Sequence, residues 1–187
     1  GLTVQAHQLD GKRFTLLREA FPNMRRIAVL AMRPPRNVDS IAEIRSVAHG
    51  LGVDVEVIHA EGREDYAAAF ATAKAKGVEA MVVAAAPEFV DDAAQLAAHA
   101  REVRIPLIGE DAGMARDGMT IGYGPKRLSF RRRAAEYVAH ILRGTPPGDL
   151  PIQQPTEFEF IVNLAAARSI GLDIARSLLV RADEVIE

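Results

Sequence analysis

The sequence predicts an α/β fold in which an open parallel sheet is flanked by helices. Four segments between residues 26 and 109 have the length and the apolar character of strands. Amphipathic segments of helical length separate them, and glycine or proline marks most of the boundaries. Strands that alternate with helices in this way are typical of parallel sheets with right-handed crossovers.

The first strand and the turn after it are the best defined part of the pattern. Residues 27–31 form a continuous apolar run, as in a central strand covered on both faces. Pro34 and Pro35 are expected to stop this strand. Asn37 is expected to cap the following helix, with its side chain accepting a hydrogen bond from a backbone N–H of the first turn. The apolar residues that then recur at helical spacing are Ile41, Ile44, Val47, Ala48 and Leu51.

The next segments continue the alternation. Residues 53–59 alternate between apolar and polar residues, which predicts an edge or half-buried strand. Gly77 has the position of a residue that ends a helix, and Pro87 follows the third strand. The expected elements in chain order are a strand at 53–59, a helix at 65–76, a strand at 79–86, a helix at 89–103 and a strand at 105–109.

The flanking segments have a different character. A short amphipathic helix is expected at 11–21, before the first strand. Beyond residue 109 the sequence becomes acidic and glycine-containing, and proline-rich near 145–155. The elements expected there are a strand at 119–124, a helix at 125–143, a strand at 156–162 and a helix at 164–170.

The composition excludes several classes of protein. The 187 residues are 49% hydrophobic and 26% charged, which is ordinary for a folded soluble chain. A net charge of -2 provides no basic surface for nucleic acid, so no nucleic-acid partner is expected. The absence of cysteine excludes disulfides, thiolate catalysis and cysteine-ligated metals. No apolar run has the length of a transmembrane helix, and no signal peptide is recognisable. The chain begins with Gly1, which is consistent with processing or trimming.

A ligand is expected where the strands end. In open α/β sheets, small molecules bind beyond the carboxyl ends of the strands, which places the first candidate site in residues 32–40. A helix N-terminus with free N–H groups favours an anion there, with Asn37 beside it. Ser40 could add a hydroxyl contact, or could be a solvated position on the helix.

The last third of the chain carries a more specific pattern. Its motifs, in order, are Tyr123-Gly124-Pro125, Arg132-Ala134-Ala135, Ile141-Leu142-Arg143-Gly144, Asp149-Leu150-Pro151, Gln154-Pro155, Asn163-Leu164, Gly171-Leu172 and Ala182-Asp183-Glu184-Val185-Ile186. With Gly11-Lys12-Arg13 and the first strand near the start, this order resembles the substrate-binding proteins of ABC transporters of the tryptophan/tyrosine type.

The resemblance implies a fold and a function. Members of this family are type I periplasmic binding proteins, in which two α/β lobes are hinged around one ligand. It implies a periplasmic or extracytoplasmic solute-binding component of an ABC importer, with a small-molecule solute and a membrane permease as partners. It implies no enzymatic activity, no catalytic residue, no metal and no cofactor.

The resemblance also implies a division of the chain. Residues 26–109 would form one complete ligand-binding lobe. Residues 1–25 and 110–187 would supply crossover segments and a partial second lobe, since family members are usually longer. A lobe surface left uncovered would favour homo-oligomers.

The end of the third strand departs from the family pattern. Amino-acid-binding members usually carry an aspartate near this point, and here the strand ends in three alanines before Pro87. In those members the aspartate pairs with the ammonium group of the ligand. Glu88 could take over this pairing, or could cap the following helix. The departure argues against an α-amino acid and for a carboxylate or a neutral amphiphile without an amine. The expected solute is a small amphiphilic carboxylate or an amino-acid-like molecule.

Two further groups are candidates for the site. Glu110 and Asp111 follow the fourth strand, where they could bind ligand, solvate a loop or make hinge contacts. Acid–base chemistry by this pair would define a small α/β enzyme, but no nucleophile or metal cluster accompanies them. Tyr123 lies between two glycines and could stack on a ligand, or could be a hinge residue buried against the other lobe.

The sequence lacks the motifs of two other functional classes, metal-binding proteins and dinucleotide-binding proteins. The five histidines are scattered without metal-ligand spacing, and no Gly-x-Gly-x-x-Gly follows a strand. The alternative that stays open is a ligand-sensing module of a signalling protein with the same fold.

Overall fold

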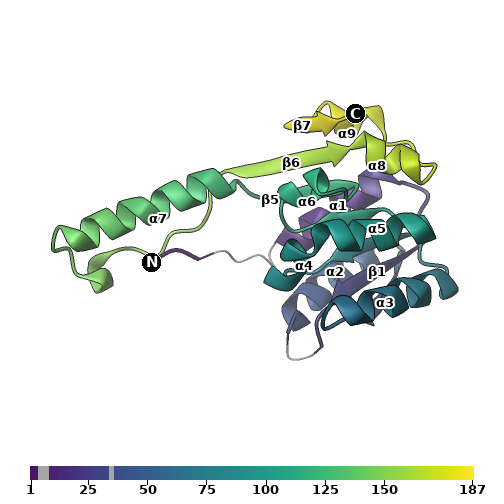
Figure 1. The fold of residues 1–187 in the computed structure, drawn as a ribbon, viewed down its shortest axis with the longest axis horizontal. Coiled ribbons are helices and arrows are strands. Elements are labelled where there is room, and N and C mark those ends of the chain that lie inside the picture. The colour runs from purple at the N-terminus through teal and green to yellow at the C-terminus, as the bar shows by residue number, and fades with distance from the viewer. Residues whose placement is uncertain (4–8, 34–35) are drawn as a thin grey trace.

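A seven-stranded mixed sheet forms the centre of the molecule (Figure 1). The computed structural model describes residues 1–3, 9–33 and 36–187, so the strand stop expected at Pro34 and Pro35 lies outside the described residues. The strand order is β2-β1-β3-β4-β5-β6-β7. The strands are β1 (Arg26–Ala31), β2 (Asp54–His59), β3 (Ala80–Val83), β4 (Leu107–Gly109), β5 (Ile121–Pro125), β6 (Phe158–Asn163) and β7 (Glu184–Ile186).

All neighbouring strands are parallel except β5 and β6, which are antiparallel. This arrangement confirms the predicted α/β fold with an open, mainly parallel sheet. The helices are α1 (Asp10–Ala20), α2 (Val38–Gly50), α3 (Arg63–Ala75), α4 (Pro87–Asp91), α5 (Ala93–Val103), α6 (Gly113–Arg116), α7 (Arg127–Leu142), α8 (Leu164–Ser169) and α9 (Arg176–Leu179), with a 3-10 turn at Pro147–Asp149. The single helix expected at 89–103 is two helices, which meet at Asp92.

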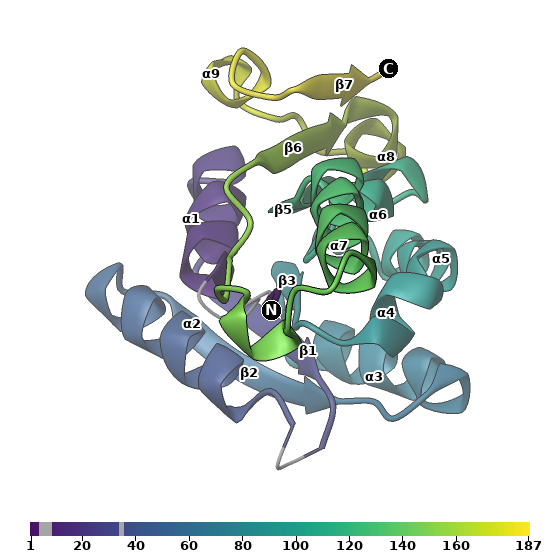
Figure 2. The same ribbon diagram turned by 90° about the vertical axis from the view of Figure 1, so that its left-hand side faces the viewer.

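Helices cover both faces of the sheet. In Figure 2, α1 and α2 lie on one side of the strands and α3 and α5 on the other. Alternate residues of β1 therefore enter different cores: Ile27 and Val29 pack with α1, and Ala28 and Leu30 pack with α3 and α5. Burial on both faces explains why this strand is apolar throughout.

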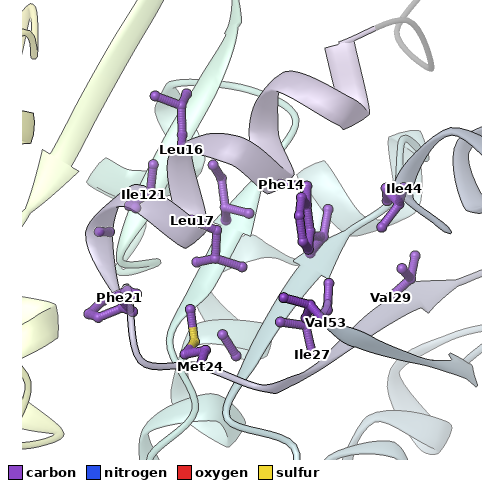
Figure 3. Close-up of a cluster of buried hydrophobic side chains, with 14 of the residues drawn as sticks. Phe14, Leu16, Leu17, Phe21, Met24, Ile27, Val29, Ile44, Val53 and Ile121 are labelled. Carbon is purple, nitrogen blue, oxygen red and sulfur yellow. The ribbon is translucent and has the colours of Figure 1, made fainter. Parts of the chain in front are cut away.

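The core on the α1 side joins segments that are far apart in the sequence. Figure 3 shows Phe14 and Leu17 of α1 beside Ile27 and Ile121, which come from β1 and β5. The sheet continues past residue 109, because β5 pairs with β4 and β6 returns antiparallel to β5. One compact unit thus extends beyond the range 26–109 expected for the lobe. We call residues 9–33, 36–125 and 158–187 the body.

A second feature stands away from the body. Helix α7 and the segment that follows it project from the ends of β5 and β6, and residues 1–3 run beside them (Figure 1). The amino group of Gly1 donates to the carbonyl of Pro151 over 2.7 Å, and Gln153 N–H donates to the carbonyl of Gly1 over 2.8 Å. We call residues 1–3 and 126–157 the arm. Helix α7 contains no buried residue.

Candidate functional site

The carboxyl ends of the parallel strands meet at the edge of the body from which the arm departs. Strands β1 to β5 all run toward this edge, so the residues that follow them lie near one another. These residues include Met32, Ala84, Glu110 and Lys126. Ligands of open α/β sheets bind at such an edge.

A pocket of about 350 Å³ lies between this edge and the arm. Its body wall comes from α4, the turn after β4 and the end of β5, and its arm wall from the first turns of α7. The lining residues are Pro87, Val90, Asp91, Glu110, Asp111, Pro125, Arg127, Phe130 and Arg131. Apolar rings and methyl groups thus alternate with charges of both signs, as in sites that bind small amphiphilic molecules. Three of the seven predicted site residues, Pro87, Glu110 and Asp111, are brought together here.

Glu110 follows β4 in the sequence, but its carboxylate lies at the end of the neighbouring strand β3. Its Oε1 atom accepts a hydrogen bond of 2.9 Å from the N–H of Ala86. Burial raises the pKa of Glu110 above its ordinary value, while the nearby charge of Arg13 acts in the opposite direction. The alanine run therefore has an acidic neighbour in space that it lacks in sequence.

Asp111 connects the body to the arm. Its Oδ1 accepts from the N–H of Gly113 over 2.8 Å, and its Oδ2 pairs with Nε of Arg127, the first residue of α7. Both carboxylate oxygens are therefore engaged by the protein itself. This contact fixes the position of the first turn of α7 relative to the turn after β4.

Asn37 does not cap α2 with its side chain, so that prediction is wrong. Its backbone is left-handed, with φ 59°, which turns the side chain toward the sheet instead of the helix. The Oδ1 atom accepts from Met32 N–H over 2.9 Å, and Nδ2 donates to the carbonyl of Ala85 over 2.7 Å. Asn37 thus joins the segments that follow β1 and β3.

Ser40 and Glu88 lie outside the lining of the pocket. Ser40 is 2% exposed and shares the inner face of α2 with Ile44, so a solvated position is wrong for it. Glu88 forms two hydrogen bonds of 2.8 Å with Arg36, and this guanidinium lowers the pKa of Glu88 to about 2. The pair connects α4 to the turn before α2 at the rim of the edge.

Tyr123 packs against the strand that pairs with its own. Its ring is stacked on Phe158, with centroids 6.0 Å apart, and meets Phe160 edge-on at 6.3 Å. Burial raises the pKa of the Tyr123 hydroxyl. The ring does not line the pocket, and its role as a ligand contact stays a prediction.

The sequence-based prediction missed a buried ion pair behind the pocket. Asp10 and Arg13 are both 0% exposed, and Arg13 Nη1 donates to Asp10 Oδ1 over 2.5 Å. Arg13 also donates through Nε to the carbonyl of Tyr123 and through Nη2 to the carbonyl of Glu110, each over 3.0 Å. The sequence signal was available, because both residues share the helix face of Phe14 and Leu17.

Two other features are absent from the described part of the chain. No group of three histidine, aspartate or glutamate side chains there could hold a metal ion. None of the described helices combines the length and the apolar character needed to cross a bilayer.

Sequence comparison identifies the family. The profile of the ABC transporter substrate binding protein family matches residues 3–186. The chain belongs to this family. No curated protein matches the sequence of this family member significantly.

Solved structures support the same fold for this chain. A conserved domain protein from Vibrio cholerae is 23% identical, with a TM-score of 0.85, and the match covers 99% of this chain and 62% of that one. An ABC domain from Streptococcus pneumonia in complex with L-Trp is 18% identical, with a TM-score of 0.81, and the match covers 95% and 62%. A TorS sensor domain–TorT complex is less similar, at 16% identity and a TM-score of 0.58 over 86% and 56%. These neighbours have the periplasmic-binding-protein fold, and the chain spans less than two thirds of their length.

Proposed function

We propose that this chain is the solute-binding component of an ABC importer and that it takes a small amphiphilic carboxylate or amino-acid-like molecule without changing it chemically. The observation that carries the proposal is the pocket between the body and the arm. Its lining offers apolar surface from Val90 and Phe130, and charges of both signs within the same small volume. Membership of the ABC transporter substrate binding protein family supports solute binding as the class of activity.

The two lobes of such a protein can be assigned in outline. We assign the body to one lobe and the arm to part of the second, with the ligand held between them. Closure around the ligand would then be a hinge motion at the ends of β5 and β6. The exposed apolar side chains of α7, among them Leu128 and Leu142, support the assignment, because a lobe would cover them.

The seven predicted residues receive two kinds of role in this proposal. Pro87, Glu110 and Asp111 line the pocket and are assigned to the ligand site itself. The others hold the surrounding edge in shape through contacts within the chain; they are Asn37, Ser40, Glu88 and Tyr123.

Solute capture is tested on the natural gene product by thermal shift against a library of amino acids and of aromatic and aliphatic acids. We expect at least one compound to raise the melting temperature in a concentration-dependent way, since a ligand that binds only the folded state stabilises it. Mass spectrometry of the recovered compound should show it unchanged. A library without any hit would contradict the proposal.

An importer component requires a permease. Family members are typically extracytoplasmic, and the expected partner is an ABC permease in the membrane. Genes for a permease and an ATPase beside the gene for this chain would support transport.

The alternative is a ligand-sensing module of a signalling protein. The likeness to a TorS sensor domain–TorT complex favours it as the second candidate. A kinase or cyclase gene in place of the permease gene would select sensing. Co-purification with the product of whichever gene is adjacent provides the direct measurement.

A further inference from the structure

Helix α4 forms part of the pocket wall, although it is too short to hold its own position. Its five residues contribute Pro87, Val90 and Asp91 to the lining. Isolated helices of this length are not stable in water, so contacts with the rest of the body must fix α4. Its N-terminal end rests on the turn after β4, since the N–H of Ala86 donates to Oε1 of Glu110 over 2.9 Å. The shape of the pocket therefore also depends on the contacts of the C-terminal end.

The C-terminal end of α4 is fixed through Asp92, the residue at which α4 and α5 meet. The N–H of Asp92 donates to the carbonyl of Glu88 over 3.0 Å, and the carbonyl of Asp92 accepts from the N–H of Leu96 over 3.0 Å. Its Oδ1 atom accepts from Nε of Arg63 over 2.7 Å, and its Oδ2 atom accepts from the hydroxyl of Tyr66 over 2.9 Å. Both side-chain donors belong to α3, so Asp92 joins three helices.

Tyr66 supports α4 in a second way. The centroid of its ring lies 6.2 Å from that of Phe89 in α4, and the two ring planes are tilted by 52°. Both side chains are fully buried. The hydroxyl of Tyr66 thus reaches Asp92 from inside the core, while its ring packs against the middle of α4.

These polar contacts lie in a core that is otherwise apolar. Apart from Tyr66, the residues that α3 and α5 bury are alanine, leucine and phenylalanine. Asp92 is 9% exposed, and a buried polar group of this kind adds little stability that apolar packing could not supply. A polar network whose members are bonded instead fixes one arrangement of the elements that it joins.

We propose that Asp92 is a positioning residue for the pocket: with Tyr66 and Arg63 it fixes α4, and the fixed helix limits the size of the solute that fits against Val90. The inference rests on the proposed function and deepens it, because it assigns the size limit of the site to one residue. The lining of the pocket does not include Asp92, so it acts on the solute only through α4.

Hydrogen exchange of the ligand-free natural gene product tests the first step. In Asp92→Ala and in Tyr66→Phe, residues 86–92 should exchange faster than in the wild type, because local opening of α4 no longer breaks all the bonds to α3. The residues of α2 should exchange at the wild-type rate. Tyr137→Phe makes the same change on the arm, where the hydroxyl donates to the carbonyl of Pro151, and should leave residues 86–92 unchanged.

Isothermal titration with two series of solutes of increasing size tests the second step. The acids are 4-methylpentanoate, 3-phenylpropanoate and indole-3-propanoate, and the amino acids are leucine, phenylalanine and tryptophan. In the wild type we expect the best and the worst member of a bound series to differ about tenfold or more in affinity, the scale on which an apolar pocket separates solutes of different size. In Asp92→Ala and Tyr66→Phe the affinities should approach equality. The double variant should behave as Asp92→Ala does, since the hydroxyl of Tyr66 acts through Asp92.

A third substitution separates position from stability. Val53 is 6% exposed and lies just before β2, at the end of the sheet opposite to the pocket. Val53→Ala should lower the melting temperature, as the loss of buried methyl groups does, and keep the full size discrimination. Circular dichroism establishes which variants are folded. If Asp92→Ala does not fold, Tyr66→Phe decides, because it removes one hydroxyl and keeps the ring.

The outcomes separate this inference from the proposed function. Unchanged exchange of residues 86–92 in both variants, or unchanged size discrimination, overturns the role of Asp92 and leaves solute capture intact. Wild-type affinities that are equal across a bound series, or an equal loss of discrimination in Val53→Ala, overturn it as well. No binding by either series or by the wider library overturns the proposed function, and the size limit with it.

Discussion

The guanidinium group of Arg13 lies entirely inside the body, where groups from distant parts of the chain bind it. Its bonds to the carbonyls of Glu110 and Tyr123 fix the ends of β4 and β5, where the pocket begins. Its pairing with Asp10 offsets part of the cost of burying both charges. At the scale of single residues, the site therefore depends on a side chain that does not line it.

Replacing Arg13 should be strongly destabilising. Arg13→Met leaves Asp10 buried without its cation, and we expect the free energy of unfolding to fall by about 3–5 kcal/mol. Urea unfolding measures the change. Lys12→Met, at the exposed neighbouring position of α1, should stay within about 0.5 kcal/mol of the wild type. A loss in Arg13→Met no larger than in this control would contradict the role assigned to the pair.

Glu110 should make stability depend on pH in a particular direction. Its pKa in the folded protein is raised above the ordinary value of 4.5, so the folded state holds the proton more tightly than the unfolded one. The contribution of Glu110 to stability is then complete below the unfolded pKa and is lost as the pH rises through the folded pKa.

The comparison with Glu110→Gln isolates this contribution. Relative to the variant, the free energy of unfolding of the wild type should decrease steadily from acidic to neutral pH. Urea unfolding across that range measures it. A difference that is constant with pH, or that grows in the opposite direction, would show that the pKa is not raised.

At the scale of elements, the turn between β1 and α2 is positioned by the side chain of one residue. Asn37 holds the segments after β1 and β3 together with two hydrogen bonds, and its backbone has a positive φ. Non-glycine residues rarely adopt this conformation, although asparagine tolerates it better than most. The turn is therefore shaped by the sheet edge on which it rests.

Asn37→Ala should affect both stability and binding. It removes both bonds and keeps the unfavourable φ, so we expect a loss of about 1–3 kcal/mol in the free energy of unfolding. A carboxylate solute should bind more weakly by about 1–2 kcal/mol, because the edge beside the pocket loosens. Asn37→Gly separates the two causes, since glycine accepts the backbone conformation and loses only the bonds. Unchanged solute affinity in both variants would show that Asn37 does not help to shape the pocket.

At the scale of the whole molecule, the arm is the part with the least internal support. Helix α7 buries none of its residues. Its apolar side chains Leu128, Val138 and Leu142 are each more than half exposed. Apolar surface of this kind is typical of a face that another protein surface covers. In the isolated 187-residue chain, a second copy is the available partner.

Self-association should therefore depend on the arm. We expect sedimentation velocity to give a concentration-dependent increase in mass for the isolated chain, and Leu142→Glu to suppress it. Val180→Glu is the matched control, because Val180 on the body is 82% exposed, as is Leu142. Equal effects of the two substitutions would show that the arm has no special part in association.

The elements that could be predicted from the sequence are those whose burial pattern is visible within a short stretch of residues. The strand at 27–31 and the strand Ala80–Val83 are apolar because helices cover both of their faces, and that pattern is readable locally. The break at Asp92 was not predicted. Its carboxylate accepts hydrogen bonds from Arg63 and Tyr66 of another helix, which no local pattern records.

By itself, the sequence determined the alternation of strands and helices, the family, and the edge of the sheet at which a solute is expected, because apolar periodicity and ordered motifs are properties of contiguous residues. Only the tertiary structure decided which side chains meet there. It brought Glu110 to Ala86, buried Arg13 behind them and turned Asn37 away from its helix. Each of these contacts joins residues from different elements, and its stability depends on burial and charge balance that exist only after the chain has folded.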